Sequence, residues 1–254
     1  MHDRPALATD ERFSAVARLY GAAAMPRLAS ARVAVVGLGG VGSWAAEALA
    51  RSGIGALRLI DADEVCIGNS NRQSHALAGN YGKPKAAVLH DRLLAISPGL
   101  AVEPVQRFLT VDRMDLLEGC DAVLDACDAL AVKAALIAHC RARRQPVVTS
   151  GSAGGRADAT KVCVRDLSRT EHDALLALVR KRLRQQHGFP RNPDRYFGVS
   201  AVYSLENVRQ PPADACARDG GGLDCGGGLG SVMHVTATFG MAAAGRLIDR
   251  LLQD

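Results

Sequence analysis

The sequence lacks several patterns that mark whole classes of protein. Its seven cysteines include no C-x-x-C pair, so neither a zinc cluster nor a disulfide framework is expected. The longest apolar stretch, residues 235–245, is well short of the roughly 20 residues that a membrane-spanning helix needs. Acidic residues interrupt the first 30 residues, which argues against a secretory signal. These absences predict a cytoplasmic protein without a membrane partner.

The sequence contains no G-x-x-x-x-G-K-[ST] motif, which excludes a P-loop enzyme. It does contain another glycine-rich stretch. In RVAVVGLGGVGSWAAEAL, residues 32–49, a hydrophobic strand pattern leads into Gly37, Gly39, Gly40 and Gly42 and then into an amphipathic helix. Gly37 permits a tight turn, Gly39 lets backbone amides approach phosphates, and Gly42 lets the helix pack closely on the strand. The stretch predicts a nucleotide-binding loop.

Short β-branched runs alternate with helical patterns through the first 150 residues. This alternation predicts an α/β, Rossmann-like fold, a mostly parallel sheet with helices on both faces. After Ser150 the rhythm changes, and additional strands are expected to extend the sheet. We expect a single domain, residues 1–254, with a nucleotide-binding core at 10–150 and an extension at 151–254. The extension would hold a basic helix at 171–187, a mobile Gly-rich loop within 206–230, and a C-terminal helix.

The glycine loop alone does not decide between a coenzyme that stays intact and a nucleotide that is cleaved. Its G-x-G-x-x-G spacing is typical of NAD-dependent oxidoreductases. Asp61, nineteen residues after Gly42, ends the next strand, where an acid can accept hydrogen bonds from ribose hydroxyls. A protein that senses a nucleotide without turnover is a further alternative.

The residues after the second strand favour cleavage. DADEVCIGNSNRQ and the following KPK supply a set of polar side chains: Asp61, Asp63, Asn71, Arg72, Gln73 and Lys85. A dehydrogenase has no use for Arg72 and Lys85 at the phosphate end. Nucleotidyl transfer needs such cations, because charge grows on the leaving pyrophosphate. After the fourth strand, VLDACD adds Asp125 and Asp128, and a carboxylate at this edge is a suitable Mg²⁺ ligand.

The stretches GLGGVGS, DADEV, NSNRQ, KPKA and DACD, in this order and spacing, resemble the superfamily that adenylates carboxylates. This superfamily includes the ubiquitin-activating enzymes and the bacterial activators of sulfur-carrier proteins. The resemblance implies ATP and Mg²⁺ as cofactors. The glycine loop would lie at the phosphates, Asp61 at the ribose, Arg72 and Lys85 at the triphosphate, and Asp128 at the metal. An N-terminal arginine, here Arg18, would reach into the partner subunit's site, which implies a homodimer.

The rest of the chain resembles the branch of this superfamily that acts on tRNA, through ARLYG, NRQSHAL, KAALIAHCR, VTSGSAGG and VTATFG. This resemblance implies a ligase-type, AMP-forming reaction that dehydrates threonylcarbamoyladenosine beside the anticodon of tRNA through an acyl-adenylate. Branches that activate sulfur-carrier proteins usually carry two C-x-x-C pairs, which this chain lacks. Adenylation of the C-terminus of such a carrier is the alternative function. Cys225 lies among glycines and is a weak candidate nucleophile. The resemblance also leaves room for sulfur-relay partners and for a monovalent cation, for which no motif is present.

A basic segment offers a surface for the tRNA. Residues 180–195 contain six basic residues and one acid. Leu175, Val179 and Leu183 recur every fourth residue and predict a core-facing stripe, which would leave Arg180 and Arg184 on another face. The candidate phosphate contacts are Arg180, Lys181, Arg182 and Arg184. A solvated helix surface is the alternative. His75 and His139 lie within apolar helical patterns and are interpreted as structural histidines.

Overall fold

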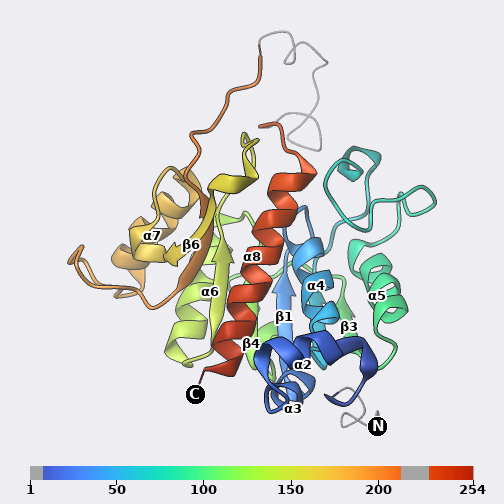
Figure 1. Ribbon diagram of the computed structural model, residues 1–254. Coiled ribbons are helices and arrows are strands. Elements are labelled where there is room, and N and C mark those ends of the chain that lie inside the picture. The colour runs from blue at the N-terminus through green and yellow to red at the C-terminus, as the bar shows by residue number, and fades with distance from the viewer. Residues whose placement is uncertain (1–7, 213–228, 254) are drawn as a thin grey trace.

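The computed structural model describes residues 8–212 and 229–253. Its centre is a seven-stranded sheet in the order β3-β2-β1-β4-β5-β7-β6 (Figure 1). All neighbouring strands are parallel except β6 and β7, which are antiparallel. The strands are β1 (Arg32–Val36), β2 (Ala56–Ile60), β3 (Ala101–Val105), β4 (Ala122–Asp125), β5 (Val147–Ser150), β6 (Val162–Asp166) and β7 (Ser200–Ser204). The predicted mostly parallel sheet, extended by later strands, is confirmed.

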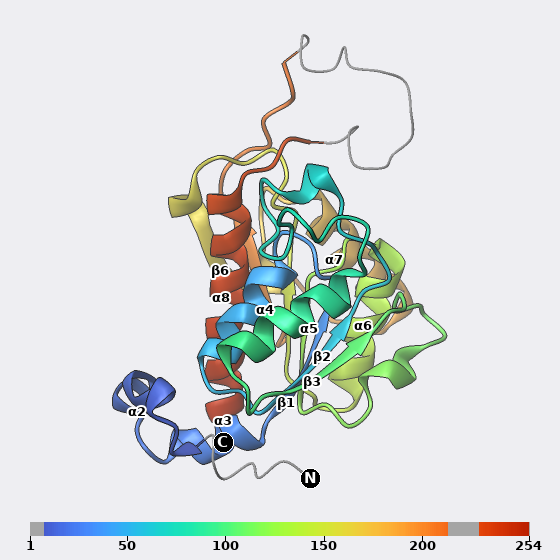
Figure 2. The same cartoon turned by 90° about the vertical axis from the view of Figure 1, so that its right-hand side faces the viewer.

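Helices cover both faces of this sheet (Figures 1 and 2). One face packs against α3 (Ala24–Ser30), α4 (Gly42–Arg51), α5 (Lys85–Ile96) and α8 (Met233–Leu252). The other face packs against α6 (Leu130–Ala142) and α7 (Ala174–Gln186). A short helix, α2 (Ser14–Tyr20), precedes α3. The 3₁₀ turns within the described residues are η1 (Glu11–Phe13), η2 (Ile67–Asn69), η3 (Met114–Leu117), η4 (Ala159–Lys161) and η5 (Leu167–Arg169).

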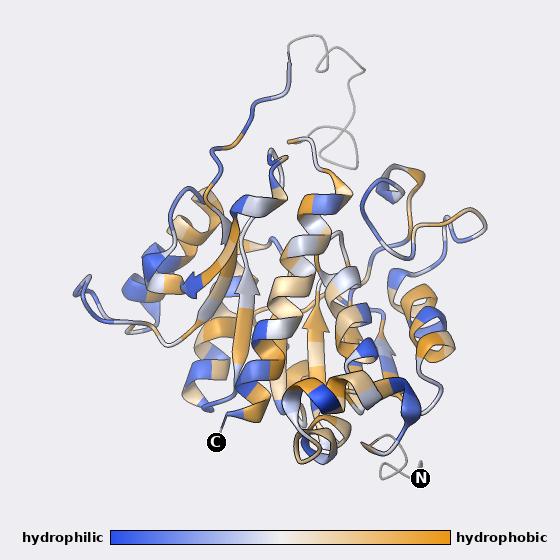
Figure 3. Cartoon of the chain, viewed as in Figure 1, coloured by the Kyte–Doolittle hydropathy of each residue, from blue (hydrophilic) through white to orange (hydrophobic). Residues whose placement is uncertain are grey.

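The central strands are buried on both faces, which explains their unbroken apolar sequences. Along β1, Val33 and Val35 pack with α4 and α8, whereas Ala34 and Val36 pack with α6. Figure 3 shows the same distribution, with apolar residues on the central strands and hydrophilic residues on the outer helix surfaces. Two packed cores, one on each side of one sheet, fix the strand ends that carry the site.

The apolar stretch near the C-terminus is a buried helix, as predicted. Within α8, Val235, Phe239 and Leu247 are fully buried against the sheet and α4. No helix among residues 8–212 and 229–253 is long and apolar enough to cross a membrane. The Gly-rich segment with Cys216 and Cys225 falls within 213–228 and lies outside the described residues.

The start of the basic helix is three residues later than predicted, and one of the three residues predicted for its buried stripe is wrong. Asp173 is the N-cap of α7 and accepts a hydrogen bond from the backbone N–H of Leu176, so the helix begins at Ala174 and not at Glu171. Its buried stripe consists of Leu176, Val179 and Leu183, whereas Leu175 is only half-buried. The spacing of three and then four residues is the one that keeps side chains on one helical face.

Candidate nucleotide-binding site

The predicted nucleotide residues follow the carboxyl ends of β1, β2 and β4. These three strands are parallel neighbours with β1 in the middle, so the loops after them meet at one edge of the sheet. Figure 1 shows this edge at the top of the sheet, where β1 leads into α4. Ligands of open parallel sheets bind outside this edge.

The glycine loop has the geometry that its sequence predicts. Gly37 has φ of +83°, and a Cβ added to Gly42 would lie 1.8 Å from the carbonyl oxygen of Gly37. Both positions therefore require glycine. Gly39 is different, because a Cβ there would meet nothing within 4 Å. The backbone at Gly39 is thus open to a ligand at the N-terminus of α4, where the helix dipole favours phosphate.

Asp61 ties the glycine loop to the second strand. Its carboxylate accepts hydrogen bonds from the backbone N–H of Leu38 at 2.6 Å and of Asp63 at 2.8 Å. Burial raises the pKa of Asp61 above its usual value, although these two hydrogen bonds partly oppose the shift. Each carboxylate oxygen can accept a second hydrogen bond, so Asp61 retains capacity for a ribose hydroxyl.

Lys85 lies at the start of α5 and is held toward the same edge. Its Nζ is 2.7 Å from Oδ2 of Asp63, and the Lys85 side chain is 8% exposed whereas that of Asp63 is 52% exposed. The ion pair therefore places one buried cation and one accessible acid beside Asp61. Because the carboxylate of Asp63 is solvated, Lys85 can exchange it for a phosphate group at small electrostatic cost.

Arg72 packs against the glycine loop. A Cβ on Gly40 would lie 3.2 Å from Cγ of Arg72. The guanidinium donates to the carbonyl of Gly68 and to Oδ1 of Asn71, both at 2.9 Å. Asn71 is exposed and donates in turn to the carbonyl of Ser231, before α8, at 2.8 Å.

The neighbouring Gln73 is buried, and its Oε1 has no hydrogen-bond partner among the described residues.

Sequence reasoning missed the role of Trp44. Its indole N–H donates to the carbonyl of Arg72 at 2.8 Å and so anchors the arginine's backbone. The signal was available in principle, because a tryptophan in a packed region needs a partner for its N–H.

The two acids after β4 occupy different environments. Asp125 is fully buried and bonded to Lys133 and Thr149, so it is not available to a ligand. Asp128 is exposed at the end of the following turn. Among the described residues no group of three His, Cys, Asp or Glu side chains could hold a metal ion. A magnesium ion at Asp128 would therefore need phosphate oxygens and water as its other ligands.

Comparison with known proteins assigns the chain to a family. A model of the ThiF family matches residues 13–254. The chain belongs to the ThiF family. Within this family it is 44% identical over 251 residues to a tRNA threonylcarbamoyladenosine dehydratase of Escherichia coli (strain K12), and the match covers 95% of this chain and 94% of the relative. It is 42% identical to a protein with the same description from Haemophilus influenzae, over 96% and 94% of the two chains.

Solved structures of the ThiF family agree with the fold. A crystal structure of E. coli tRNA N6-threonylcarbamoyladenosine dehydratase in complex with ATP superimposes with a TM-score of 0.86 at 43% identity. The match covers 95% of this chain and 94% of that chain. A structure of the same E. coli protein in complex with AMP gives the same TM-score, identity and coverage.

In this ThiF-family chain, Arg18 does not join the other site residues. It is exposed on α2, which precedes the amino end of β1, whereas the glycine loop follows the carboxyl end. Figure 2 shows α2 standing out from the body of the molecule at the end of the sheet opposite the nucleotide edge. Arg18 therefore cannot reach the nucleotide edge of its own chain in this structure.

The basic helix α7 presents only part of its predicted charge to solvent. Arg180 is half-buried and donates to Oγ1 of Thr170, and Arg184 donates to the carbonyl of Pro190 at 3.2 Å and lies over the Phe197 ring. The sequence placed these two arginines on a face away from the buried stripe, and in the structure both guanidinium groups are engaged by other parts of the chain. In contrast, Lys181 and Arg182 have no hydrogen bond or ion pair within the described part of the chain.

Three of the described cysteine thiols are poor nucleophiles. Burial, reinforced by the carboxylate of Asp125, raises the pKa of Cys127 well above its usual value. Burial likewise raises the pKa of Cys120, and that of Cys140 to about 12. Since the thiolate is the reactive form, these three cysteines suit packing and not covalent chemistry. Cys225 lies outside the described residues.

Proposed function

We propose that this chain is an ATP-dependent enzyme that dehydrates threonylcarbamoyladenosine beside the anticodon of tRNA, releasing AMP and pyrophosphate. The observation that carries this proposal is the match along almost the whole chain to tRNA threonylcarbamoyladenosine dehydratases, one of which has been crystallised with ATP and with AMP. The site supports it, because an open glycine loop, a ribose-directed acid and two cations lie along one edge of the sheet.

The reaction consists of two substitutions. The threonyl carboxylate of the modified base attacks the α-phosphorus of ATP, and the bond from this phosphorus to the bridging oxygen breaks, so that pyrophosphate leaves. The acid is now a mixed anhydride with AMP. The urea-like group then attacks the activated carbonyl and loses a proton, and AMP departs with the former carboxylate oxygen. The net change is the loss of one water from the nucleoside and the cleavage of one ATP.

The chain's part in this chemistry is positioning and charge. The backbone around Gly39 receives the phosphates, and Asp61 accepts hydrogen bonds from the ribose. Lys85 and Arg72 stabilise the charge that develops on the leaving pyrophosphate. Asp128 would hold Mg²⁺, which supplies further charge neutralisation when bound. No enzyme nucleophile is required, because the tRNA itself provides both attacking groups.

Arg18 acts in this proposal from the second subunit of a homodimer. None of the residues of α2 is buried, and Leu19 on this helix is 76% exposed. An exposed apolar helix that stands out from its own chain is well suited to pack on another copy. Placed there, Arg18 would approach the partner's triphosphate site as a third cation.

Lys181 and Arg182 are the proposed phosphate contacts for the tRNA on α7. They lack partners within the described part of the chain, so binding phosphate breaks no existing ion pair. Sulfur-relay proteins are proposed as further partners on the family resemblance alone.

Mass spectrometry of nucleosides tests the proposed reaction. tRNA that carries threonylcarbamoyladenosine is incubated with the protein, ATP and Mg²⁺, digested and analysed. We expect the modified nucleoside to lose the mass of one water only when ATP is present, with one AMP formed per product. Pyrophosphate release that responds to a sulfur-carrier protein but not to this tRNA would select the alternative acceptor. NAD binding without ATP binding would select an oxidoreductase.

A further inference from the structure

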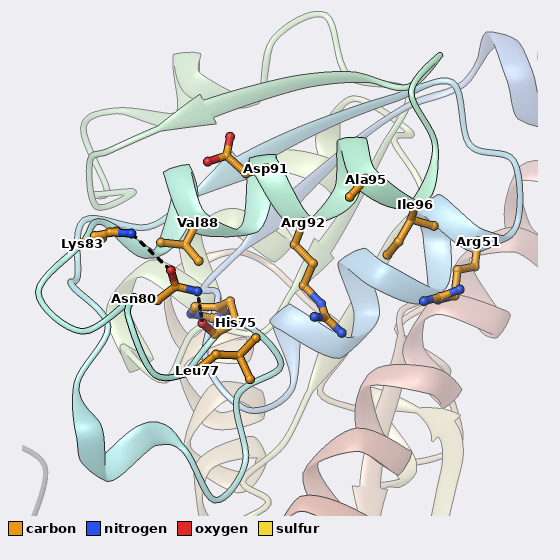
Figure 4. Close-up of a pocket in the computed structure, with 10 residues that line it drawn as sticks. All are labelled: Arg51, His75, Leu77, Asn80, Lys83, Val88, Asp91, Arg92, Ala95 and Ile96. Carbon is orange, nitrogen blue, oxygen red and sulfur yellow. Dashed lines mark hydrogen bonds between the residues drawn. The ribbon is translucent and has the colours of Figure 1, made fainter.

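A cavity lies between α5, the end of α4 and the turn that follows Gln73. Its volume is about 370 Å³. Figure 4 shows side chains from all three segments around it, with Arg51 and Arg92 on facing helices. The lining residues are Arg51, His75, Leu77, Asn80, Lys83, Val88, Asp91, Arg92, Ala95 and Ile96. None of them belongs to the proposed nucleotide contacts.

One buried carboxylate holds the two arginines of this cavity together. Oε1 of Glu47 accepts from Nε of Arg51 at 2.9 Å, and Oε2 accepts from Nε of Arg92 at 2.7 Å. Glu47 is 5% exposed, so the shared carboxylate fixes both guanidinium groups at the rim. Their terminal Nη groups have no partner among the described residues. Two fixed guanidinium edges beside each other form an arrangement that matches the oxygens of an anion.

The charge of the lining is positive. Arg51, Arg92 and Lys83 contribute three cations, and Lys83 has only a 3.4 Å hydrogen bond to Asn80. The one acid that lines the cavity, Asp91, is 84% exposed and points to His90 at 2.9 Å. The carboxylate of Glu47 neutralises one of the three positive charges, and a bound oxyanion would neutralise most of the remaining charge.

A buried histidine without a hydrogen-bond partner adds an independent observation. His75 lines the cavity, is 0% exposed, and neither of its ring nitrogens has a partner among the described residues. The segment before it shows the same feature, because Oε1 of Gln73 and Oγ of Ser74 are also buried without partners. Contrary to its interpretation from the sequence, His75 lies in a turn and not in a helix. Buried polar groups are rarely left unsatisfied, so three in succession indicate a place where a ligand or ordered water completes the structure.

The pKa of this histidine reflects its burial and the cations around it. Burial lowers the pKa of His75 to about 4, and the charges of Lys85 and Arg92 contribute to the shift. The ring is therefore neutral near pH 7, with one nitrogen able to donate and the other able to accept.

We propose that this cavity is an oxyanion-binding site, distinct from the nucleotide site, for a small molecule that carries a phosphate or carboxylate group. The terminal guanidinium groups of Arg51 and Arg92 bind the anion, with Lys83 at the rim and His75 as a hydrogen-bond partner at the floor. The apolar side of the cavity, formed by Leu77, Val88, Ala95 and Ile96, accepts a short aliphatic part of the ligand.

Nuclear magnetic resonance of the histidine ring nitrogens tests the site on the intact chain without ATP or tRNA, so its outcome is independent of the proposed reaction. Inorganic phosphate and butyrate are titrated separately at constant ionic strength, and the His75 signals are assigned with His75→Gln. We expect at least one anion to shift these signals saturably. A response to phosphate alone would identify a phosphorylated ligand, and a response to butyrate alone a carboxylate.

Two variants locate the binding. Lys83→Gln, an exposed position, should weaken it roughly threefold to tenfold, and Arg51→Gln with Arg92→Gln should abolish it. Arg113→Gln, outside the cavity, and Arg72→Ala, on the glycine-loop side, should leave the affinity unchanged. Should the double variant unfold, Lys83→Gln alone still decides. The proposal is overturned if neither anion shifts His75, or if affinity is lost in Arg72→Ala and retained in the cavity variants.

Discussion

Nζ of Lys133 lies 2.8 Å from Oδ2 of Asp125, and neither side chain is exposed to solvent. Thr149 donates to the same oxygen at 2.7 Å, and the other oxygen, Oδ1, accepts from the backbone N–H of Cys127 at 3.2 Å. Burial alone would lower the pKa of Lys133, but the carboxylate of Asp125 raises it, so the lysine is charged. Through Asp125 the pair holds the backbone of Cys127. The backbone of Ala126 and Cys127 in turn packs against the glycine loop, because a Cβ on Gly37 would lie 2.9 Å from both.

Breaking the pair should destabilise the chain severely. Lys133→Met leaves the buried carboxylate of Asp125 without its cation, and we expect the free energy of unfolding to fall by about 3–5 kcal/mol in urea denaturation. The double variant Lys133→Met, Asp125→Leu removes both charges and should recover most of the loss. A single variant that unfolds at the same urea concentration as the unmodified protein would show that the pair does not support the fold.

Substitution of two glycines in the loop should separate binding from folding. Gly39→Ala introduces a methyl group that meets no protein atom, so it should fold normally yet bind ATP more weakly, because the methyl group occupies the space of the phosphates. Gly42→Ala places the methyl group 1.8 Å from a carbonyl oxygen and should lower the melting temperature. Calorimetric titration and thermal unfolding measure the two effects. Normal ATP affinity in Gly39→Ala would place the phosphates elsewhere.

These residues also show what the sequence could predict. Gly37, Gly42 and Asp61 lie where the motif puts them, because a strand, a tight turn and a helix are determined by neighbouring residues. Lys133 gave no signal, because a lysine in a helical pattern usually lies on the surface, and the burial of this one depends on the acid at the end of β4.

The errors in α7 have a similar cause. Asp173 accepts an N-cap hydrogen bond from the backbone N–H of Leu176 and so sets the helix start, and Leu176 takes the place of Leu175 in the buried stripe. The inward turn of Arg184 depends on Phe197, which is distant in the sequence. The pairing of β7 between β5 and β6 is likewise a long-range contact that no local pattern encodes.

Loss of Lys85 should impair the reaction and spare the fold. Lys85→Ala removes a cation from the developing pyrophosphate, and we expect turnover of modified tRNA to drop by about a hundredfold or more. Its partner Asp63 is half-exposed, so water can solvate the carboxylate that remains. Lys161→Ala is the matched control, because Lys161 makes a 3.8 Å ion pair with Asp158 at the surface. Near-normal ATP-dependent turnover in Lys85→Ala would contradict the assigned role.

The neutral His75 should make the protein sensitive to acid. Its pKa is about 4 in the folded chain against an ordinary 6.5, so below pH 6.5 the unfolded chain binds a proton that the folded chain refuses. Stability is therefore fully retained above pH 6.5 and falls as the pH drops toward 4, by up to about 3 kcal/mol. In His75→Gln this part of the decline should disappear from urea denaturation curves measured between pH 7 and pH 4. Parallel declines in the two proteins would mean that the folded chain protonates His75 readily.

The two kinds of cation on α7 should respond differently to neutralisation. Lys181→Gln with Arg182→Gln removes side chains that have no partner within the described residues, so tRNA affinity should fall and its salt dependence should become shallower by about 1.5 to 2 units. Arg184→Gln instead loses the contact over Phe197, at 5.2 Å, and the hydrogen bond to Pro190. It should cost about 1 kcal/mol of stability and change the salt dependence little. Because Arg184 is turned inward, an equal effect of both variants on tRNA binding would indicate that the helix acts through its fold and not through its surface charge.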